Sequence, residues 1–399
     1  MKKTRYIVFT LLAISLAASA QNMTSSPYSR LAYGDLSDET PNTFRGMGGV
    51  GIGMRNNLAI NPMQPASYTA CDSATFMFDL AGSVMWTTYA DANGRKNKAN
   101  GNLEYLMLQL PIWRQHIAFS AGVLPYSSVG YDFALQDSIN SDYHYTTSYI
   151  GKGGITQIFG GLSFNILDWF AVGANAYYMF GEVTNYRGLA FTEGLSTVDQ
   201  YAMVKVSSVR TRVGAQLFHR FEHHSFTVGA IWEPTLPLHG DFYLAEVTWE
   251  DTISVTQPAM AVPMQWGVGA SYAYDNRLTI AFDYQYQDWA HATTYNNQTL
   301  HSRAIYSLGA EYRHNPASRN YAARMYWRAG LKIADPYIGS MASKEYKASI
   351  GVGFPLRNAA TVFNVTLEYD HRGTTLVEDC LKLTLNAAIH ENWFFKRRL

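Results

Sequence analysis

Three groups of residues in this sequence have types and spacing that could do chemistry, and the first is a glycine pattern. Gly46, Gly48 and Gly51 satisfy G-x-G-x-x-G, which binds dinucleotide phosphates when a strand precedes it and a helix follows it. The preceding stretch, 38–43, reads DETPNT and is typical of a loop. Two asparagines and two prolines follow the glycines. These flanks argue against a nucleotide site.

The second group is a cluster of histidines. His219, His223 and His224 crowd one predicted turn, where they could bind a metal, although a solvated turn explains them as well. The sequence contains neither G-x-S-x-G nor H-E-x-x-H, and no nucleophile can be matched with a base by spacing. We therefore expect no metal site, no cofactor and no enzymatic activity.

The third group consists of charged residues that recur at alternate positions of predicted strands. Arg210 and Arg212 share one strand face and could grip a carboxylate in bidentate fashion. The set could bind the polar head of an amphipathic ligand, or form a hydrated ion-pair network inside a barrel, whose interior tolerates charge. The candidates are Asp79, Glu104, Arg210, Arg212, Asp283, Glu311, Arg328 and Glu368.

These charged residues are predicted to lie on β-strands, because apolar and polar residues alternate with a period of two along the chain. In the stretch 170–181 every second residue is apolar and its neighbours are small or polar, and 278–287 repeats the pattern. Such residues point to opposite faces of a strand. Fourteen strands are predicted, near 75–90, 101–112, 116–136, 143–165, 169–187, 200–219, 224–236, 263–275, 277–292, 299–314, 322–336, 343–357, 361–372 and 376–390. Asp241 to Val255 is assigned to an outside hairpin.

The connections between these strands form two classes. One class is predicted to be tight: 113–115, 165–168, 220–224, 275–277, 314–319 and 357–360. The other is mostly longer: 91–100, 137–142, 187–200, 236–263, 291–298, 335–344 and the short 370–374. Tight turns on one side and long loops on the other are typical of an outer-membrane barrel with an even number of strands.

Composition supports a membrane barrel. Charged residues are only 16%, whereas aromatic residues reach 14%, and basic and acidic residues balance at 31 each, which gives no basic excess for nucleic acid. A bilayer offers an open sheet edge no hydrogen bonds, so spanning strands must close. Aromatic residues at predicted strand ends, including Trp86, Tyr126, Trp169 and Trp289, suit the membrane interfaces. A soluble β-sandwich or propeller would leave them unexplained.

The N-terminus has the features of an export signal. A cationic start, an apolar core from Tyr6 to Leu16 and Ala18-Ser19-Ala20 indicate a signal peptide at 1–20 and a location in the outer membrane of a Gram-negative cell. Cys71 and Cys380 are predicted to lie at different heights, which disfavours a disulfide.

Residues 21–73 are predicted to form a plug, and 74–399 the transmembrane β-barrel that closes around it. Arg45 to Tyr68 is too rich in Gly and Pro for a helix or a regular strand. Glycine permits close backbone packing against a wall. The predicted plug or gate residues are Arg45, Gly46, Gly48, Gly49, Gly51, Gly53, Asn61 and Pro62.

Four stretches, taken together, resemble one family. They are 45–62, 151–157 together with Gly173 to Gly181, Asp283 to Trp289, and Glu391 to Arg397. In this order the chain resembles the FadL-type outer-membrane transporter family, in the divergent form common in Bacteroidetes. The resemblance implies a 14-strand barrel, an N-terminal hatch and uptake of hydrophobic compounds. The family's Asn-Pro-Ala reads Asn61-Pro62-Met63 here, and no stretch aligns with the family's ligand-binding residues.

Two functions follow from these observations. The favoured hypothesis is passive uptake of small hydrophobic or amphipathic molecules through the plugged lumen. The alternative is a structural or docking component of an outer-membrane assembly or secretion complex, without transport activity, which the long excursion 236–263 favours. The expected partners are outer-membrane lipids, and either a hydrophobic small-molecule ligand or other envelope proteins.

Overall fold

The structure is a computed structural model that describes residues 24–92, 94–113, 115–140, 143–191, 198–247, 251–256, 260–293, 299–338, 343–356 and 361–392. The predicted signal peptide and the end of the C-terminal motif, 393–397, lie outside the described residues. Among the described residues, no helix has the length and apolar character needed to cross a membrane.

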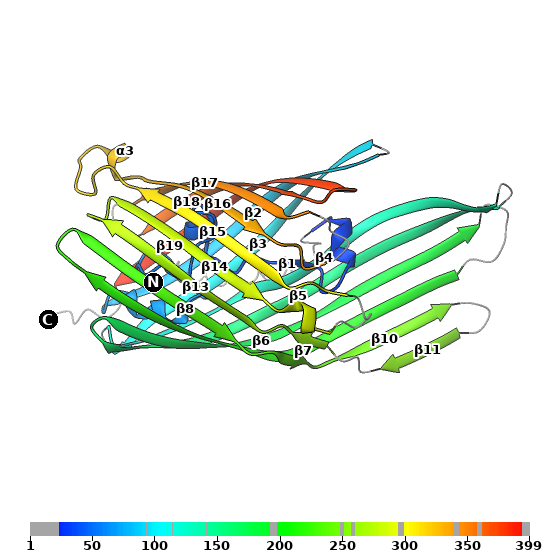
Figure 1. The fold of residues 1–399 in the computed structure, drawn as a ribbon, viewed down its shortest axis with the longest axis horizontal. Helices are drawn as coiled ribbons and strands as arrows, with labels where there is room; N and C mark the ends of the chain where they lie inside the picture. Colours follow the sequence, from blue (N-terminus) through cyan, green and yellow to red (C-terminus); the bar gives the residue numbers. More distant parts are fainter. Residues whose placement is uncertain are drawn as a thin grey trace, which may run out of the picture.

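Fourteen antiparallel strands form a closed barrel (Figure 1), which confirms the predicted fold class. Closure comes from pairing of the last wall strand with the first, for example Leu381 opposite Trp86. The wall strands are β2 (Thr75–Asp91), β3 (Gly94–Trp113), β4 (Ile117–Asn140), β5 (Tyr143–Leu167), β6 (Phe170–Phe191), β7 (Val198–Arg220), β8 (His224–Glu233), β13 (Gln265–Tyr274), β14 (Leu278–Gln287), β15 (Arg303–Tyr312), β16 (Tyr326–Ala334), β17 (Glu345–Pro355), β18 (Val362–Arg372) and β19 (Val377–Asn392).

The wall is taller on one side than on the other. Strands β4 to β7 contain 24, 25, 22 and 23 residues, whereas β13 to β16 contain 10, 10, 10 and 9. A tilted strand crosses a bilayer with about 9–11 residues. The long strands therefore continue as a sheet beyond the spanning part (Figure 1), and we call this part the projecting sheet.

Three predicted loops are wrong for this reason. The described residues of 91–100, 137–142 and 187–200 belong largely to the strands of the hairpins β2–β3, β4–β5 and β6–β7, whereas 93, 141–142 and 192–197 lie outside the described residues. Cross-strand pairs continue into these regions, as in the rings of Tyr145 and Phe191, whose centroids lie 5.8 Å apart. Pairing with a neighbouring strand outweighs the local preference of polar and glycine residues for loops.

The outside hairpin predicted from Asp241 to Val255 is confirmed. Strands β10 (Gly240–Val247) and β11 (Asp251–Thr256) pair with each other, and β10 also pairs with β7. The short strands β9 (Leu236–Leu238) and β12 (Met260–Val262) form a separate two-stranded sheet between this hairpin and the wall. The hairpin widens the projecting sheet rather than adding a spanning strand.

The tight turn predicted at 314–319 is instead a longer, ordered connection that projects from the barrel. The connection between β15 and β16, residues 313–325, contains the one-turn helix α3 (Tyr321–Arg324). The Asn320 side chain caps this helix by accepting from the amide of Ala322 at 3.1 Å. Asparagine at a cap position satisfies an amide that would otherwise lack a partner, which explains why an ordered structure replaces a simple reversal.

Aromatic residues at the strand ends divide between the two faces. Trp86 and Trp169 are 47% and 50% exposed on the outer face, as a residue at the membrane interface should be. Tyr126 and Trp289 contradict the prediction, because both are buried inside the barrel. Trp289 follows β14 in a short 3₁₀ helix, η3 (Trp289–His291), and its ring lies between those of Tyr33 and Tyr337.

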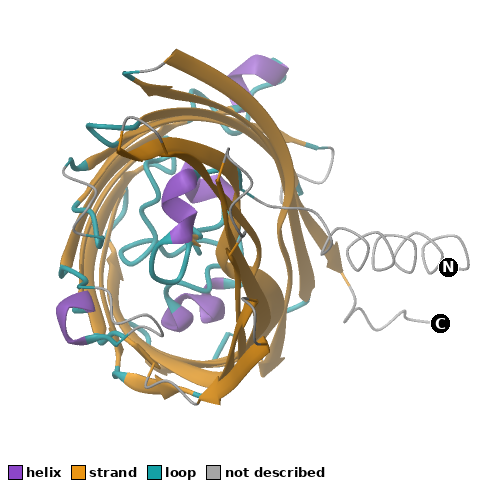
Figure 2. Cartoon of the chain, turned by 90° about the vertical axis from the view of Figure 1, so that its right-hand side faces the viewer, coloured by secondary structure: helices purple, strands orange, loops and turns teal. Residues whose placement is uncertain are grey.

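The N-terminal segment, residues 24–73, lies inside the ring of strands (Figure 2). It contains a 3₁₀ helix η1 (Pro27–Arg30), a short strand β1 (Asp35–Leu36), a one-turn helix α2 (Asn42–Arg45) and a 3₁₀ helix η2 (Pro65–Ala70). The glycine stretch between α2 and η2 is preceded directly by the helix α2 and not by a strand, so the nucleotide motif lacks its required context.

The backbone of the N-terminal segment packs directly against the backbone of the barrel strands at several glycines. A Cβ atom added at Gly330 of β16 would lie 2.0 Å from the amide nitrogen of Gly48. One added at Gly48 would lie 2.6 Å from the carbonyl oxygen of Leu331, and Gly48 also has a φ of +72°. Only glycine fits on either side of this contact.

We predict that Gly330→Ala destabilises the barrel by about 1–3 kcal/mol, because the added methyl group overpacks this contact. The measurement is the urea concentration at which the folded band disappears on unheated electrophoresis gels. Gly160→Ala is the matched control, since its Cβ would meet only Phe119, at 4.0 Å. Equal midpoints for the two variants would contradict the proposed packing.

Candidate functional site

A carboxylate of the wall binds the glycine stretch directly. Asp283 of β14 points into the lumen, and its Oδ2 accepts hydrogen bonds from the amides of Gly51 at 2.5 Å and Ile52 at 2.7 Å. Its Oδ1 accepts a third from Gly53 at 3.2 Å. Successive amides that converge on one anion form an anion-binding nest. The glycines therefore bind a protein carboxylate in place of a phosphate.

The predicted arginine pair binds carboxylates of the chain itself. Arg210 Nη2 lies 2.5 Å from Glu39 Oε1, and Arg212 Nη2 lies 2.6 Å from Glu39 Oε2. Both arginines also pair with Glu233 of β8. The two arginines and two glutamates therefore pair with one another, so both guanidinium groups already bind carboxylates of the chain itself.

Electrostatics hold Glu39 ionised within this group. Burial of the Glu39 carboxylate disfavours its charge, but Arg210 and Arg212 outweigh burial and lower the pKa of Glu39 to about 2. The amide of Gln157 donates to the same carboxylate at 2.8 Å. Because Glu39 belongs to the N-terminal segment, this group ties the segment to β5, β7 and β8.

A second group of ion pairs holds the other side of the segment. Buried Arg45 pairs with Glu104 of β3 at 2.5 Å, and Lys382 of β19 pairs with the same carboxylate at 2.7 Å. Arg45 also donates to the carbonyl oxygens of Asp38 and Thr40. Lys332 of β16 pairs with Asp38 at 2.9 Å. Charges from one arc of the wall, which runs from β16 through β19 to β3, thus converge on one short stretch of the segment.

The predicted plug residues Asn61 and Pro62 form hydrogen bonds that involve backbone carbonyl oxygens. The carbonyl oxygen of Pro62 accepts from Asn175 at 2.9 Å, from Tyr177 at 3.0 Å and from Arg212 at 3.2 Å. The side chain of Asn61 donates to the carbonyl oxygen of Gly51 at 2.8 Å, which folds the segment upon itself. Their predicted role as a gate stays a prediction.

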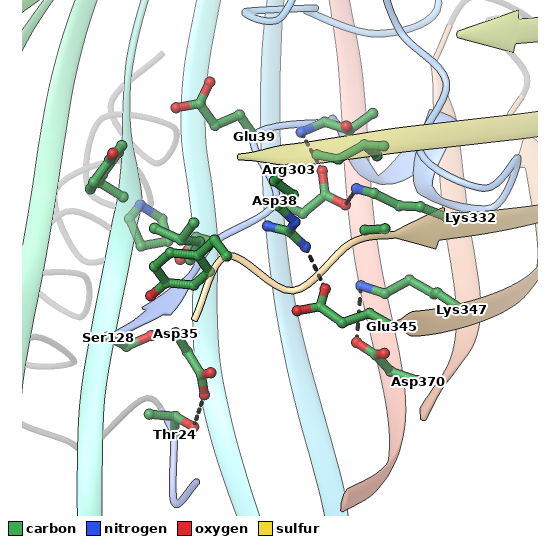
Figure 3. A pocket seen from close by; sticks show the side chains of 18 of the residues that line it. Thr24, Asp35, Asp38, Glu39, Ser128, Arg303, Lys332, Glu345, Lys347 and Asp370 are labelled. Atoms are coloured by element: carbon green, nitrogen blue, oxygen red, sulfur yellow. Dashed lines mark hydrogen bonds and ion pairs between the residues drawn. The ribbon is translucent and has the colours of Figure 1, made fainter. Parts of the chain in front are cut away.

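A cavity of about 260 Å³ remains in the lumen (Figure 3). Its lining carries charges of both signs from the N-terminal segment and from strands around the barrel, and Lys332 and Arg303 approach it from neighbouring strands. The charged lining residues are Asp35, Asp38, Glu39, Glu104, Arg210, Arg212, Arg303, Lys332, Glu345, Lys347, Glu368, Asp370, Arg372, Glu378 and Lys382. Apolar side chains, including Trp289, Tyr337 and Ile338, line the same cavity, so its wall is mixed, and the charged part of it favours water and ions over an apolar solute.

The structure divides the predicted lumen residues into two sets. Glu104, Arg210, Arg212 and Glu368 line the cavity, whereas Asp79, Asp283, Glu311 and Arg328 lie elsewhere on the inner wall. Arg328 pairs with Glu311 at 2.6 Å, and Asp79 accepts from Asn386. Sequence reasoning missed Glu39 and Glu233. The alternation of β8 places Glu233 on the inner face, so strand phase could have identified it.

The histidines and cysteines make local contacts only. His223 Nδ1 lies 2.6 Å from Asp275 Oδ1, and His224 Nδ1 lies 2.8 Å from the Tyr272 hydroxyl, both at the surface. Cys71 and Cys380 are free thiols in this structure. Burial raises the pKa of the Cys71 thiol, which keeps it protonated and unreactive at neutral pH.

We predict that Asp283→Ala lowers the free energy of unfolding by about 3 kcal/mol or more, since three buried amides lose their acceptor. Asp283→Asn keeps an acceptor oxygen and should have a smaller effect. The measurement is hydrogen–deuterium exchange of peptides covering 47–56, which should become fast in Asp283→Ala.

The control for this prediction is Asp132→Ala, because Asp132 is an exposed carboxylate on β4. It should leave exchange in 47–56 unchanged. Slow exchange of that region in Asp283→Ala would show that the carboxylate does not hold the segment.

Comparison with known proteins supports this architecture. The sequence finds no match among curated proteins. Three solved structures share the fold: the CymD monoaromatic hydrocarbon channel (14% identity, TM-score 0.61, 90% of this chain and 99% of that chain), the Ralstonia pickettii toluene transporter TbuX (14%, 0.59, 89% and 99%) and the P. putida toluene transporter TodX (13%, 0.60, 90% and 100%).

At these identities the likeness shows the fold alone, a FadL-type barrel, which confirms the broader part of the predicted resemblance. The Bacteroidetes branch stays a prediction. A family model named BamG matches residues 1–399, which is the whole sequence. The chain therefore belongs to the BamG family.

Proposed function

We propose that this protein is a sealed outer-membrane barrel that serves as a structural or docking component of an envelope complex. The observation that carries the proposal is the way the N-terminal segment fills the lumen. Wall strands around the barrel bind the segment through buried side chains, including β3, β7, β14 and β16. What remains open is a cavity with a charged lining.

The energetics of the segment favour a permanent seal. Residues 40–53 are all buried, and the pairs of Arg45 with Glu104 and of Arg212 with Glu39 lie within the folded interior. Removing one partner from a buried pair costs about 3–5 kcal/mol, because the other charge is left uncompensated. Withdrawal of the whole segment would break several such pairs together. The barrel and its segment thus behave as one folding unit.

The lining also argues against a path for hydrocarbons. Lys332, Lys347 and Glu368 face the same space as Arg210 and Arg212. An apolar solute would displace water from these charged groups and return no hydrogen bonds to them. A structural or docking component does not need a lumen that apolar solutes can pass through.

The projecting sheet offers such a surface. Strands β4 to β7 and the β10–β11 hairpin extend beyond the spanning part of the barrel (Figure 1). Leu135 is 54% exposed and Tyr201 is 44% exposed on this sheet. Exposed apolar side chains outside the membrane are typical of protein contact surfaces.

A second candidate function is passive uptake of small hydrophobic or amphipathic molecules, with the N-terminal segment as gate. Its support is the fold shared with hydrocarbon channels and an apolar cluster inside the barrel, of which Tyr126, Val262 and Trp289 line the same cavity as the charged residues. In that cluster the ring of Tyr33 lies 5.6 Å from that of Trp289, and Leu238 and Val262 of the β9–β12 sheet pack nearby.

We predict that the protein migrates in native gels well above the mass of one chain when envelopes are solubilised in mild detergent. Reversible crosslinking before solubilisation should retain the same assembly. Purified chain in liposomes should pass labelled toluene no faster than empty liposomes do.

Migration as a single chain in both preparations would contradict the docking function. Toluene flux above that of empty liposomes, abolished by crosslinking the N-terminal segment to the wall, would instead favour the second candidate.

A further inference from the structure

The projection between β15 and β16, residues 313–325, concentrates positive charge at the end of the barrel where the tight turns lie. The stretch 313–325 contains three arginines and no aspartate or glutamate. Arg277, in the neighbouring turn, adjoins it, because its carbonyl oxygen accepts from the amide of Arg313 at 2.6 Å. Tight turns mark the periplasmic end of a bacterial barrel.

These turn arginines differ from those of the lumen in having no carboxylate. Within the described ranges, Arg277, Arg313, Arg319 and Arg324 form no ion pair, whereas Arg210, Arg212 and Arg328 are all paired. Arg277 and Arg319 are exposed. Charge that the chain does not neutralise is open to a partner with the opposite sign.

The projection is also held in one shape. Arg313 Nε donates to the carbonyl oxygen of Arg324 at 3.0 Å, and its guanidinium lies 4.5 Å from the centroid of the Tyr326 ring. The amide of Asn315 donates to the carbonyl oxygen of Ala323 at 2.8 Å. Next to the charges Tyr321 is 42% exposed. A preformed surface loses little conformational entropy when it binds, which favours recognition.

The orientation of the strands indicates that water, rather than lipid, lies before Arg313. Along β15 and β16 the inward phase includes Glu311 and Arg328, and Arg313 continues it. Tyr312 and Trp327 are in the outward phase and are 47% and 49% exposed, as for residues of the membrane interface. Arg313 therefore lies at the mouth of the barrel and not among lipid headgroups.

We propose that this cationic turn surface, formed by Arg277, Arg313, Arg319, Tyr321 and Arg324, docks an acidic segment of a periplasmic protein partner. Arginine binds carboxylates with geometric specificity, and the exposed tyrosine provides an apolar contact beside them. The inference rests on the proposed docking function and names the surface and the partner's chemistry.

The test uses the full mature protein in nanodiscs of phosphatidylcholine. The probe is a fluorescein-labelled peptide of repeated Glu-Glu-Phe, and a Gln-Gln-Phe peptide is its neutral counterpart. Binding is measured by fluorescence anisotropy at low and physiological salt. The variant Arg277→Glu/Arg319→Glu changes only exposed side chains, so that the fold is preserved. Arg95→Glu/Lys96→Glu makes the same charge change in the β2–β3 hairpin, at the opposite end of the barrel.

We expect the wild type to bind the acidic peptide and not the neutral one, with affinity falling as salt rises. Arg277→Glu/Arg319→Glu should weaken binding roughly tenfold or more, and the control variant should bind as the wild type does. Absence of wild-type binding, or equal loss in both variants, would overturn the proposal. Retention of phosphatidylglycerol by the wild type alone in native mass spectrometry, without peptide binding, would also overturn it and assign the surface to lipid.

Native gels of the envelope separate this inference from the docking function. If the wild type migrates as a large assembly and Arg277→Glu/Arg319→Glu does not, the surface carries the contact. If both migrate as the assembly, docking stands and this surface is not its site. If the wild type migrates as a single chain, the docking function itself fails.

Discussion

The carboxylate of Asp283 and the three amides that it binds determine much of the arrangement inside this barrel. An ionised group within a protein needs several donors, and the amides of Gly51, Ile52 and Gly53 provide them from consecutive positions. The backbone must approach the wall closely to reach the carboxylate. A Cβ atom at Gly53 would lie 2.6 Å from the amide nitrogen of Ala270, so this approach requires glycine. The glycine-rich composition of the segment follows from this contact.

Once the backbone is held against β14, the charges on either side find partners within the chain. Glu39 reaches Arg210 and Arg212, and Arg45 reaches Glu104. Each pair offsets the desolvation of the other groups, and each pair joins the N-terminal segment to a different part of the wall. The interior is therefore polar and contains the N-terminal segment, which suits the proposed docking component more than a conduit for apolar solutes.

The sequence allows the barrel to be predicted because alternation of period two depends on strand geometry alone. The fourteen strands, their even number and the outside hairpin all follow from that pattern and from turn residues. The inward phase likewise identifies Asp283, Arg210 and Arg212. The height of the projecting sheet could not be predicted, because pairing between strands such as β4 and β5 outweighs local loop preferences.

Contacts between distant segments explain the other failures. Trp289 has the residue type and the position in the sequence that are typical of the membrane interface, but it lies inside the barrel, where its ring packs against those of Tyr33 and Tyr337. Glu39 lies in a stretch typical of a loop, and only the folded chain brings it to Arg210 and Arg212. The projection at 313–325 depends on a cap by Asn320 that turn propensity does not anticipate.

Electrical recording across a planar bilayer tests the sealed lumen most directly. Purified wild-type protein, inserted and verified as folded, should produce no steady ionic conductance, since the N-terminal segment occupies the lumen in every molecule. A stable ohmic conductance from the unmodified protein would mean that ions pass freely through the barrel, and it would contradict the account.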